Sequence, residues 1–115
     1  MNSSRPENVS SIFSIKGDCE WEDACVKSSN FPDGYSSYDS CTITILQHVD
    51  LEPDVIFEVE SCCDILEIGG TRILSFDDIP DFLRTGQIIQ WDTDGARNRA
   101  GWQICFEVSK FLIIA

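Results

Sequence analysis

The sequence predicts an all-β protein, an antiparallel two-sheet sandwich or a barrel, and three observations support this class. Short segments with alternating apolar and polar side chains recur along the chain, as strands require when one face is buried. Polar or glycine-containing turns separate these segments, and no stretch is convincing as a helix that could connect parallel strands. A length of 115 residues leaves room for one domain only.

The first half of the chain contains two predicted strands with a break between them. Residues 41–46 and 55–60 alternate clearly, and residues 50–54, which include a proline, interrupt the pattern. The expected core-facing side chains are Cys41, Ile43 and Ile45 in the first strand and Val55, Phe57 and Val59 in the second. We expect both strands to contribute one face to the core.

Three further strands are predicted in the second half. Residues 64–70 form a strand closed by a Gly-Gly turn, and residues 88–92 and 101–108 repeat the format on either side of a polar turn at 93–100. Trp91 and Trp102 occupy strand positions and are expected in the core. These spacings favour short antiparallel connections.

The two ends of the chain carry less information. Residues 1–16 lack a continuous apolar core after a basic start, so they are predicted to be a flexible tail and not a secretory signal. Asn2 and Asn8 stand in N-glycosylation acceptor patterns. Residues 109–115 form an apolar end, which is either the close of a strand or the point where a longer protein has been cut. The domain proper is therefore placed at residues 17–108.

Composition restricts the environment and the partners. Eight basic and twenty acidic residues give a net charge of −12, which disfavours nucleic acid and anionic lipid and favours cations or basic protein surfaces. Six cysteines and one histidine favour disulfides over a mixed Cys/His metal site. We therefore expect an extracellular protein or the ectodomain of a membrane protein, with membrane contact only through a tether missing from this chain.

The cysteines allow many pairings. Six cysteines permit 15 connectivities. The disulfide candidates are Cys19, Cys25, Cys41, Cys62, Cys63 and Cys105. Cys62 and Cys63 are adjacent and would project to opposite faces of an extended backbone, so at most one of them is expected to reach Cys105. Zinc is disfavoured because the paired Cys-x-x-Cys pattern is absent from the sequence.

Several segments together resemble the CUB domain family. Residues 25–35, Cys-Val-Lys-Ser-Ser-Asn-Phe-Pro-Asp-Gly-Tyr, followed by the Cys-led strand at 41–45, look like the opening of such a domain. The later segments that resemble the family in order are 57–60, 64–68, 89–94 and 101–106. The resemblance covers residues 17–108 and implies a jelly-roll sandwich. It also implies a bridge from the N-terminal region to Cys41, with Cys25 preferred over Cys19 as the partner.

The same resemblance implies a calcium site. Positions that match the family's calcium-binding residues are Tyr35, Glu60, Asp64 and Asp94. Three carboxylates brought together repel one another, and Ca²⁺, which prefers oxygen ligands in irregular geometry, would remove that conflict. Glu60, Asp64 and Asp94 are the expected metal ligands, and Tyr35 is expected to orient one of the carboxylates through its hydroxyl.

These observations favour a binding module over an enzyme. The expected function is calcium-dependent extracellular recognition or adhesion, in which acidic loops receive a Lys or Arg of a protein ligand. One alternative is a calcium-assisted carbohydrate-binding module with Trp21 or Tyr38 stacking on sugar, and another is a structural spacer. Trp21 is also a candidate partner contact. An enzyme is not expected, because His48 has no recognisable catalytic partners and no phosphate-binding loop follows Gly69-Gly70.

Overall fold

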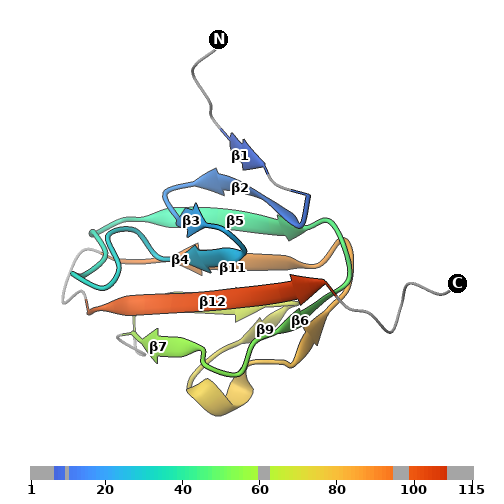
Figure 1. Ribbon diagram of the computed structural model, residues 1–115. Coiled ribbons are helices and arrows are strands. Elements are labelled where there is room, and N and C mark those ends of the chain that lie inside the picture. The colour runs from blue at the N-terminus through green and yellow to red at the C-terminus, as the bar shows by residue number, and fades with distance from the viewer. Residues whose placement is uncertain (1–6, 10, 60–62, 95–98, 109–115) are drawn as a thin grey trace, which may run out of the picture.

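The chain folds into two antiparallel β-sheets packed face to face (Figure 1). The structure is a computed structural model, and it describes residues 7–9, 11–59, 63–94 and 99–108. Within this part the only helical element is a single 3₁₀ turn, η1, at Phe76–Asp78. The predicted class, an antiparallel two-sheet sandwich, is confirmed. No helix in the described residues is both long and apolar enough to span a membrane.

The first sheet has six strands in the order β1-β2-β5-β11-β8-β9. Their bounds are Glu7–Val9 for β1, Phe13–Gly17 for β2, Ser40–Ile45 for β5, Ile88–Asp92 for β11, Ile65–Ile68 for β8 and Thr71–Arg72 for β9. The central pair is β5 and β11, and Trp91 lies opposite Cys41 in its register. Every neighbouring pair is antiparallel.

The second sheet is built around its longest strand, β12. The order is β10-β6-β12-β4-β3, and β7 also pairs with β12. The bounds are Phe82–Leu83 for β10, Val49–Leu51 for β6, Gly101–Val108 for β12, Cys25–Lys27 for β4, Glu20–Glu22 for β3 and Ile56–Glu58 for β7. Both β6 and β7 run antiparallel to β12, β6 against residues 106–108 and β7 against residues 101–103. They behave as one strand interrupted near Pro53, which has no N–H to donate.

The core lies between the sheets and follows the alternation in the sequence. Cys41, Ile43 and Ile45 of β5 are all buried, and the threonines between them are half-buried. Trp91 and Trp102 are fully buried, as expected, and their rings pack edge to face with centroids 5.9 Å apart. Val55, Phe57 and Val59 are half-buried and pack against the core, while Ile56 between them is exposed. The predicted faces of both strands are therefore correct.

The N-terminal segment differs from the expected flexible tail. Residues 13–17 form β2, which pairs along its length with β5, and Phe13 and Ile15 are fully buried core residues. The alternation there covers too few residues to stand out in the sequence, and burial against the second sheet supplies the stability. Asn8 lies in β1, opposite Ile15. Asn2 and residues 109–115 lie outside the described residues.

Two disulfides are described, and they correct the expected pairing. Cys19 pairs with Cys41, and Cys25 pairs with Cys105. The preference for a Cys25–Cys41 bridge was wrong because Cys25 lies directly opposite Cys105 in the β4–β12 register, and Cys19, between β2 and β3, is the partner of Cys41. Because Cys105 is bonded to Cys25, neither Cys62 nor Cys63 is its partner. Cys63 is also disulfide-bonded, and Cys62 lies outside the described residues.

The start of β12 depends on a glycine. Gly101 has φ +113°, and a Cβ atom there would lie 2.0 Å from Oγ of Ser28. Ser28 is fully buried, and its Oγ accepts a hydrogen bond from the backbone N–H of Trp102 at 3.1 Å. Only glycine fits this close approach and this backbone angle. The contact joins β12 to the loop that follows β4.

Candidate functional site

Three loops meet at one end of the sandwich, on the left in Figure 1. The first follows β4 and carries Tyr35, the second precedes β8 and carries Asp64, and the third follows β11 and carries Asp94. The backbone N–H of Tyr35 donates to the carbonyl of Arg99 at 3.2 Å, and that of Tyr38 donates to the carbonyl of Asp94 at 3.0 Å. These bonds hold the first loop against the third.

The centre of this end is the carboxylate of Asp64. Its side chain is only 3% exposed. Oδ2 accepts a hydrogen bond from the hydroxyl of Tyr35, and Oδ1 accepts one from the backbone N–H of Asp94 at 3.0 Å. One side chain thus joins all three loops, through residues that are 29 and 30 positions away in the sequence.

Tyr35 reaches Asp64 because its ring is fixed in the core. The ring is 2% exposed and packs edge-on against Trp91, with centroids 5.0 Å apart and an interplanar angle of 86°. A Tyr ring buried this way needs a partner for its hydroxyl, and the Asp64 carboxylate supplies it. The role expected for Tyr35, orienting a calcium-binding carboxylate, stays a prediction.

A second buried carboxylate, Asp39, stabilises the same end. It is 8% exposed and accepts hydrogen bonds from the Ser29 hydroxyl and from the Ser36 backbone N–H at 3.3 Å. The backbone of Asp39 forms two hydrogen bonds with Thr93. Its N–H donates to Oγ1 of Thr93 at 2.8 Å, and its carbonyl accepts from the Thr93 N–H at 2.9 Å. Asp39 therefore fixes the Tyr35 loop to the residue next to Asp94. Sequence reasoning did not select Asp39 or Thr93.

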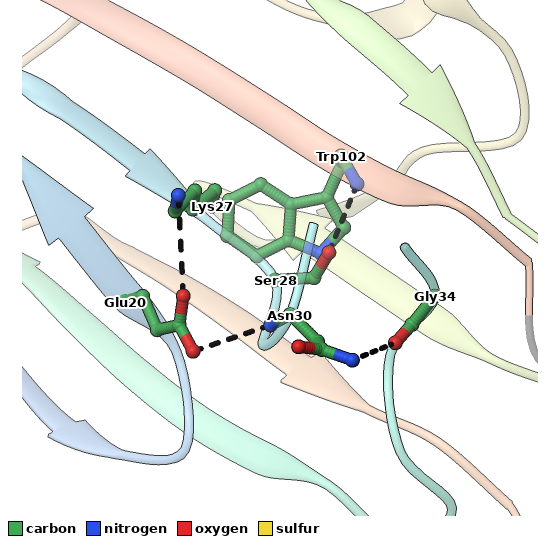
Figure 2. Close-up of polar contacts among 6 residues, drawn as sticks. All are labelled: Glu20, Lys27, Ser28, Asn30, Gly34 and Trp102. Carbon is green, nitrogen blue, oxygen red and sulfur yellow. Dashed lines mark hydrogen bonds and ion pairs between the residues drawn. The ribbon is translucent and has the colours of Figure 1, made fainter. Parts of the chain in front are cut away.

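The beginning of the Tyr35 loop is shaped by local polar contacts (Figure 2). Asn30 adopts φ +64°, which asparagine tolerates better than most residues, and its Nδ2 donates to the Gly34 carbonyl at 3.2 Å. The Asn30 backbone N–H donates to Oε2 of Glu20 at 3.2 Å, and Oε1 of Glu20 lies 4.0 Å from Nζ of Lys27. These contacts connect the loop to β3 and β4 before it turns toward Asp64.

The electrostatics of Asp64 suit a cation. Its two hydrogen bonds are its only polar contacts within the described residues, and neither comes from a basic side chain. A buried carboxylate without an opposite charge is costly, because hydrogen bonds replace only part of its hydration. Each oxygen retains acceptor capacity after accepting one bond. The site can therefore accept further positive charge.

Three of the four predicted site residues, Tyr35, Asp64 and Asp94, are among the described residues. The Tyr35 hydroxyl and the backbone N–H of Asp94 meet at the Asp64 carboxylate, whereas Glu60 lies outside the described residues. In the part of the chain that the structure describes, no group of three or more His, Cys, Asp or Glu residues is arranged to hold a metal ion. The calcium ligand set therefore stays a prediction. Trp21 lies away from this end, on β3, where its ring is 37% exposed and packs edge-on against Phe13.

Fold and site together define a disulfide-bonded, all-β sandwich with a buried carboxylate at a loop junction. No protein-family model matches the chain, and it matches neither a curated protein nor a solved structure. The two described disulfides are typical of proteins that fold in an oxidising compartment.

Proposed function

We propose that the chain is a calcium-dependent extracellular recognition module of CUB type. The observation that supports this most directly is the buried carboxylate of Asp64, bonded by the Tyr35 hydroxyl and the Asp94 N–H, with no basic partner in the described residues. Asp94 contributes its backbone N–H to this junction, and a role for its carboxylate as a calcium ligand is part of the proposal. A jelly-roll arrangement of the strands is part of the same proposal.

Asp64 and Asp94, together with Glu60, would hold the cation. Ca²⁺ would supply the positive charge that this end lacks and would draw carboxylates on separate loops together. Tyr35 keeps the Asp64 carboxylate in one orientation, and Asp39 keeps the Tyr35 loop against Thr93. The resulting acidic surface would receive a Lys or Arg side chain of a protein ligand through charge-assisted hydrogen bonds.

Thermal unfolding of the full chain in chelator and in calcium tests the proposal. Extracellular calcium modules have Kd values of about 10⁻⁴–10⁻³ M, and a Ca²⁺ concentration ten times Kd would stabilise the fold by about 1.4 kcal/mol. We expect Tm to rise by several degrees in millimolar Ca²⁺, and to rise less in Mg²⁺ at equal ionic strength. Asp64→Asn and Asp94→Asn should each reduce the calcium-induced rise.

The control substitution is Asp23→Asn. Asp23 is exposed on the β3–β4 turn with φ +55°, which asparagine tolerates, so this change removes one charge without altering the candidate site. It should leave the calcium response unchanged. Equal melting of the wild-type protein in chelator and in millimolar Ca²⁺ would eliminate the calcium proposal, whatever the variants do.

A carbohydrate-binding function is the second candidate, and Tyr38 favours it. Its ring is 79% exposed, and its backbone N–H bonds to Asp94, so an aromatic face stands beside the candidate site. Stacking of such a ring on a sugar would use the same end of the molecule. Binding to a glycan array that is lost on Tyr38→Ala would select this function over protein recognition.

A further inference from the structure

A separate groove lies between the β6–β7 connection and the segment that includes η1. The 3₁₀ turn η1 is the coiled ribbon at the bottom of Figure 1. The groove has a volume of about 250 Å³, and residues 76–81 form the wall that includes η1. Its apolar lining includes Val55, Phe76 and Ile79. Phe76 is 53% exposed, which is unusual for a phenylalanine in a small soluble domain. The groove therefore contains an aromatic ring that is exposed to solvent.

Main-chain hydrogen bonds hold both walls of the groove. The backbone N–H of Leu51 donates to the Asp81 carbonyl at 2.9 Å, which fixes the two walls to each other. On the η1 side, the Asp78 carboxylate accepts from the backbone N–H groups of Leu74 and Ser75 at 2.9 and 3.1 Å. The groove is therefore formed before any partner binds, which reduces the entropy lost on binding.

The rim of the groove carries uncompensated negative charge. Glu52, Asp77 and Asp81 line it, and all three are exposed. In the described residues none of these carboxylates bonds to another side chain, whether basic or neutral. An apolar lining surrounded by negative charges is complementary to an apolar side chain that has cationic groups on either side.

The dimensions of the groove favour a peptide side chain over a small-molecule ligand. Small-molecule pockets usually measure about 300–1,000 Å³, and this groove is smaller. The groove is also distinct from the Asp64 site, because β6 pairs with the C-terminal end of β12, whereas the Asp64 loops adjoin its N-terminal end. The two sites can be occupied independently.

We propose that this groove binds a basic peptide segment of a partner protein, with one aliphatic or aromatic side chain against Phe76 and flanking Lys or Arg side chains on the acidic rim. Phe76 acts as the apolar contact at the centre, and Glu52, Asp77 and Asp81 select for cations. This proposal does not depend on calcium binding, and it adds a second recognition surface to the molecule.

Fluorescence anisotropy with the full chain in chelator tests the proposal. The probe is a fluorescein-labelled peptide of alternating lysine and leucine, compared with peptides in which glycine replaces leucine or glutamate replaces lysine. Phe76→Ala and the double variant Asp77→Asn/Asp81→Asn should each weaken binding of the Lys/Leu peptide by at least about tenfold, which corresponds to about 1.4 kcal/mol. Both control peptides should bind at least about tenfold more weakly than the Lys/Leu peptide.

The matched control is Glu22→Gln/Asp23→Asn, which removes the same charge from the exposed end of β3 and the turn that follows it. This variant should change the affinity less than twofold. Equal losses in the two double variants would show general attraction to an acidic protein and would overturn the proposal. Concentration-dependent dimerisation that Phe76→Ala abolishes would also overturn it, because the occupant would then be a second copy. Phe76 is exposed, so its truncation should leave the melting curve intact, which the same samples can verify.

Discussion

At the residue scale, the hydroxyl of Tyr35 is the contact that can be tested most cleanly. Tyr35→Phe removes one oxygen and leaves the ring against Trp91, but it takes a hydrogen-bond donor away from a carboxylate that is 3% exposed. An unsatisfied buried acceptor costs about 1–3 kcal/mol. We expect the free energy of unfolding in chelator to fall by that amount, as measured by urea denaturation.

Tyr38→Phe is the control for this substitution. Tyr38 is in the same loop, is 79% exposed, and its hydroxyl makes no hydrogen bond in the described residues. Its loss should not change the denaturation midpoint measurably. If both variants unfold at the wild-type midpoint, Tyr35 does not hold Asp64 in solution. If both variants are destabilised equally, the substitutions perturb the loop in general, and the destabilisation does not report the bond from Tyr35 to Asp64.

Two of the site residues could not be found from the sequence because their roles depend on contacts across the fold. Asp39 forms hydrogen bonds with Ser29, Ser36 and Thr93, and Thr93 is 54 positions away. No spacing in the chain indicates that pairing. Tyr35, Asp64 and Asp94 were selected through the family resemblance, and the local pattern alone would not have distinguished them from the many exposed acids of this chain.

At the element scale, alternation predicted most of the longer strands, with β2 as the exception, and missed most of the short ones. The bounds of β11 and β12 agree with the expected residues 88–92 and 101–108 because each strand has several buried positions in alternation. β3, β4, β6 and β10 have two or three residues each, too few for a period to be recognised. These strands exist because β12 and its neighbours offer hydrogen-bonding partners. The disulfide partners could not be predicted because they depend on which strands pair: Cys25 meets Cys105 only through the β4–β12 register.

The two described disulfides should differ in their reactivity toward reductants. Cys19 and Cys41 are 4% and 2% exposed, whereas Cys25 and Cys105 are half-buried on paired strands of the second sheet. An attacking thiolate must reach a sulfur atom, so access controls the rate. Under native conditions a limiting amount of dithiothreitol should open Cys25–Cys105 before Cys19–Cys41.

Differential alkylation followed by peptide mass spectrometry measures the order of reduction. The control is the same experiment in denaturant, where burial no longer protects either bond and the two should react at similar rates. Earlier labelling of Cys19 and Cys41 in the native protein would contradict the burial of that bridge. The comparison is internal to one sample, so it needs no substitution of a cysteine.

At the scale of the whole molecule, the net charge of −12 on 115 residues opposes compaction. Salt should therefore stabilise the fold, because the Debye length falls from about 30 Å at 0.01 M to about 3 Å at 1 M. We expect Tm in chelator to rise steadily with NaCl over this range. The combined variant Glu22→Gln/Asp23→Asn/Asp77→Asn/Asp81→Asn has a net charge of −12 + 4 = −8 and should show a smaller rise. An equal rise in both proteins would mean that self-repulsion does not limit stability.

The direction of β12 decides how the molecule can be presented to a partner. This strand begins at Gly101 beside the Tyr35 loop and ends at Val108, and its eight residues span roughly 23 Å. Whatever is attached after Val108, whether a neighbouring domain, an affinity tag or a sensor surface, is joined on the far side from the Asp64 loops (Figure 1). A partner or surface joined directly at Val108 would therefore leave that end facing the solution, and coupling near those loops would obstruct it.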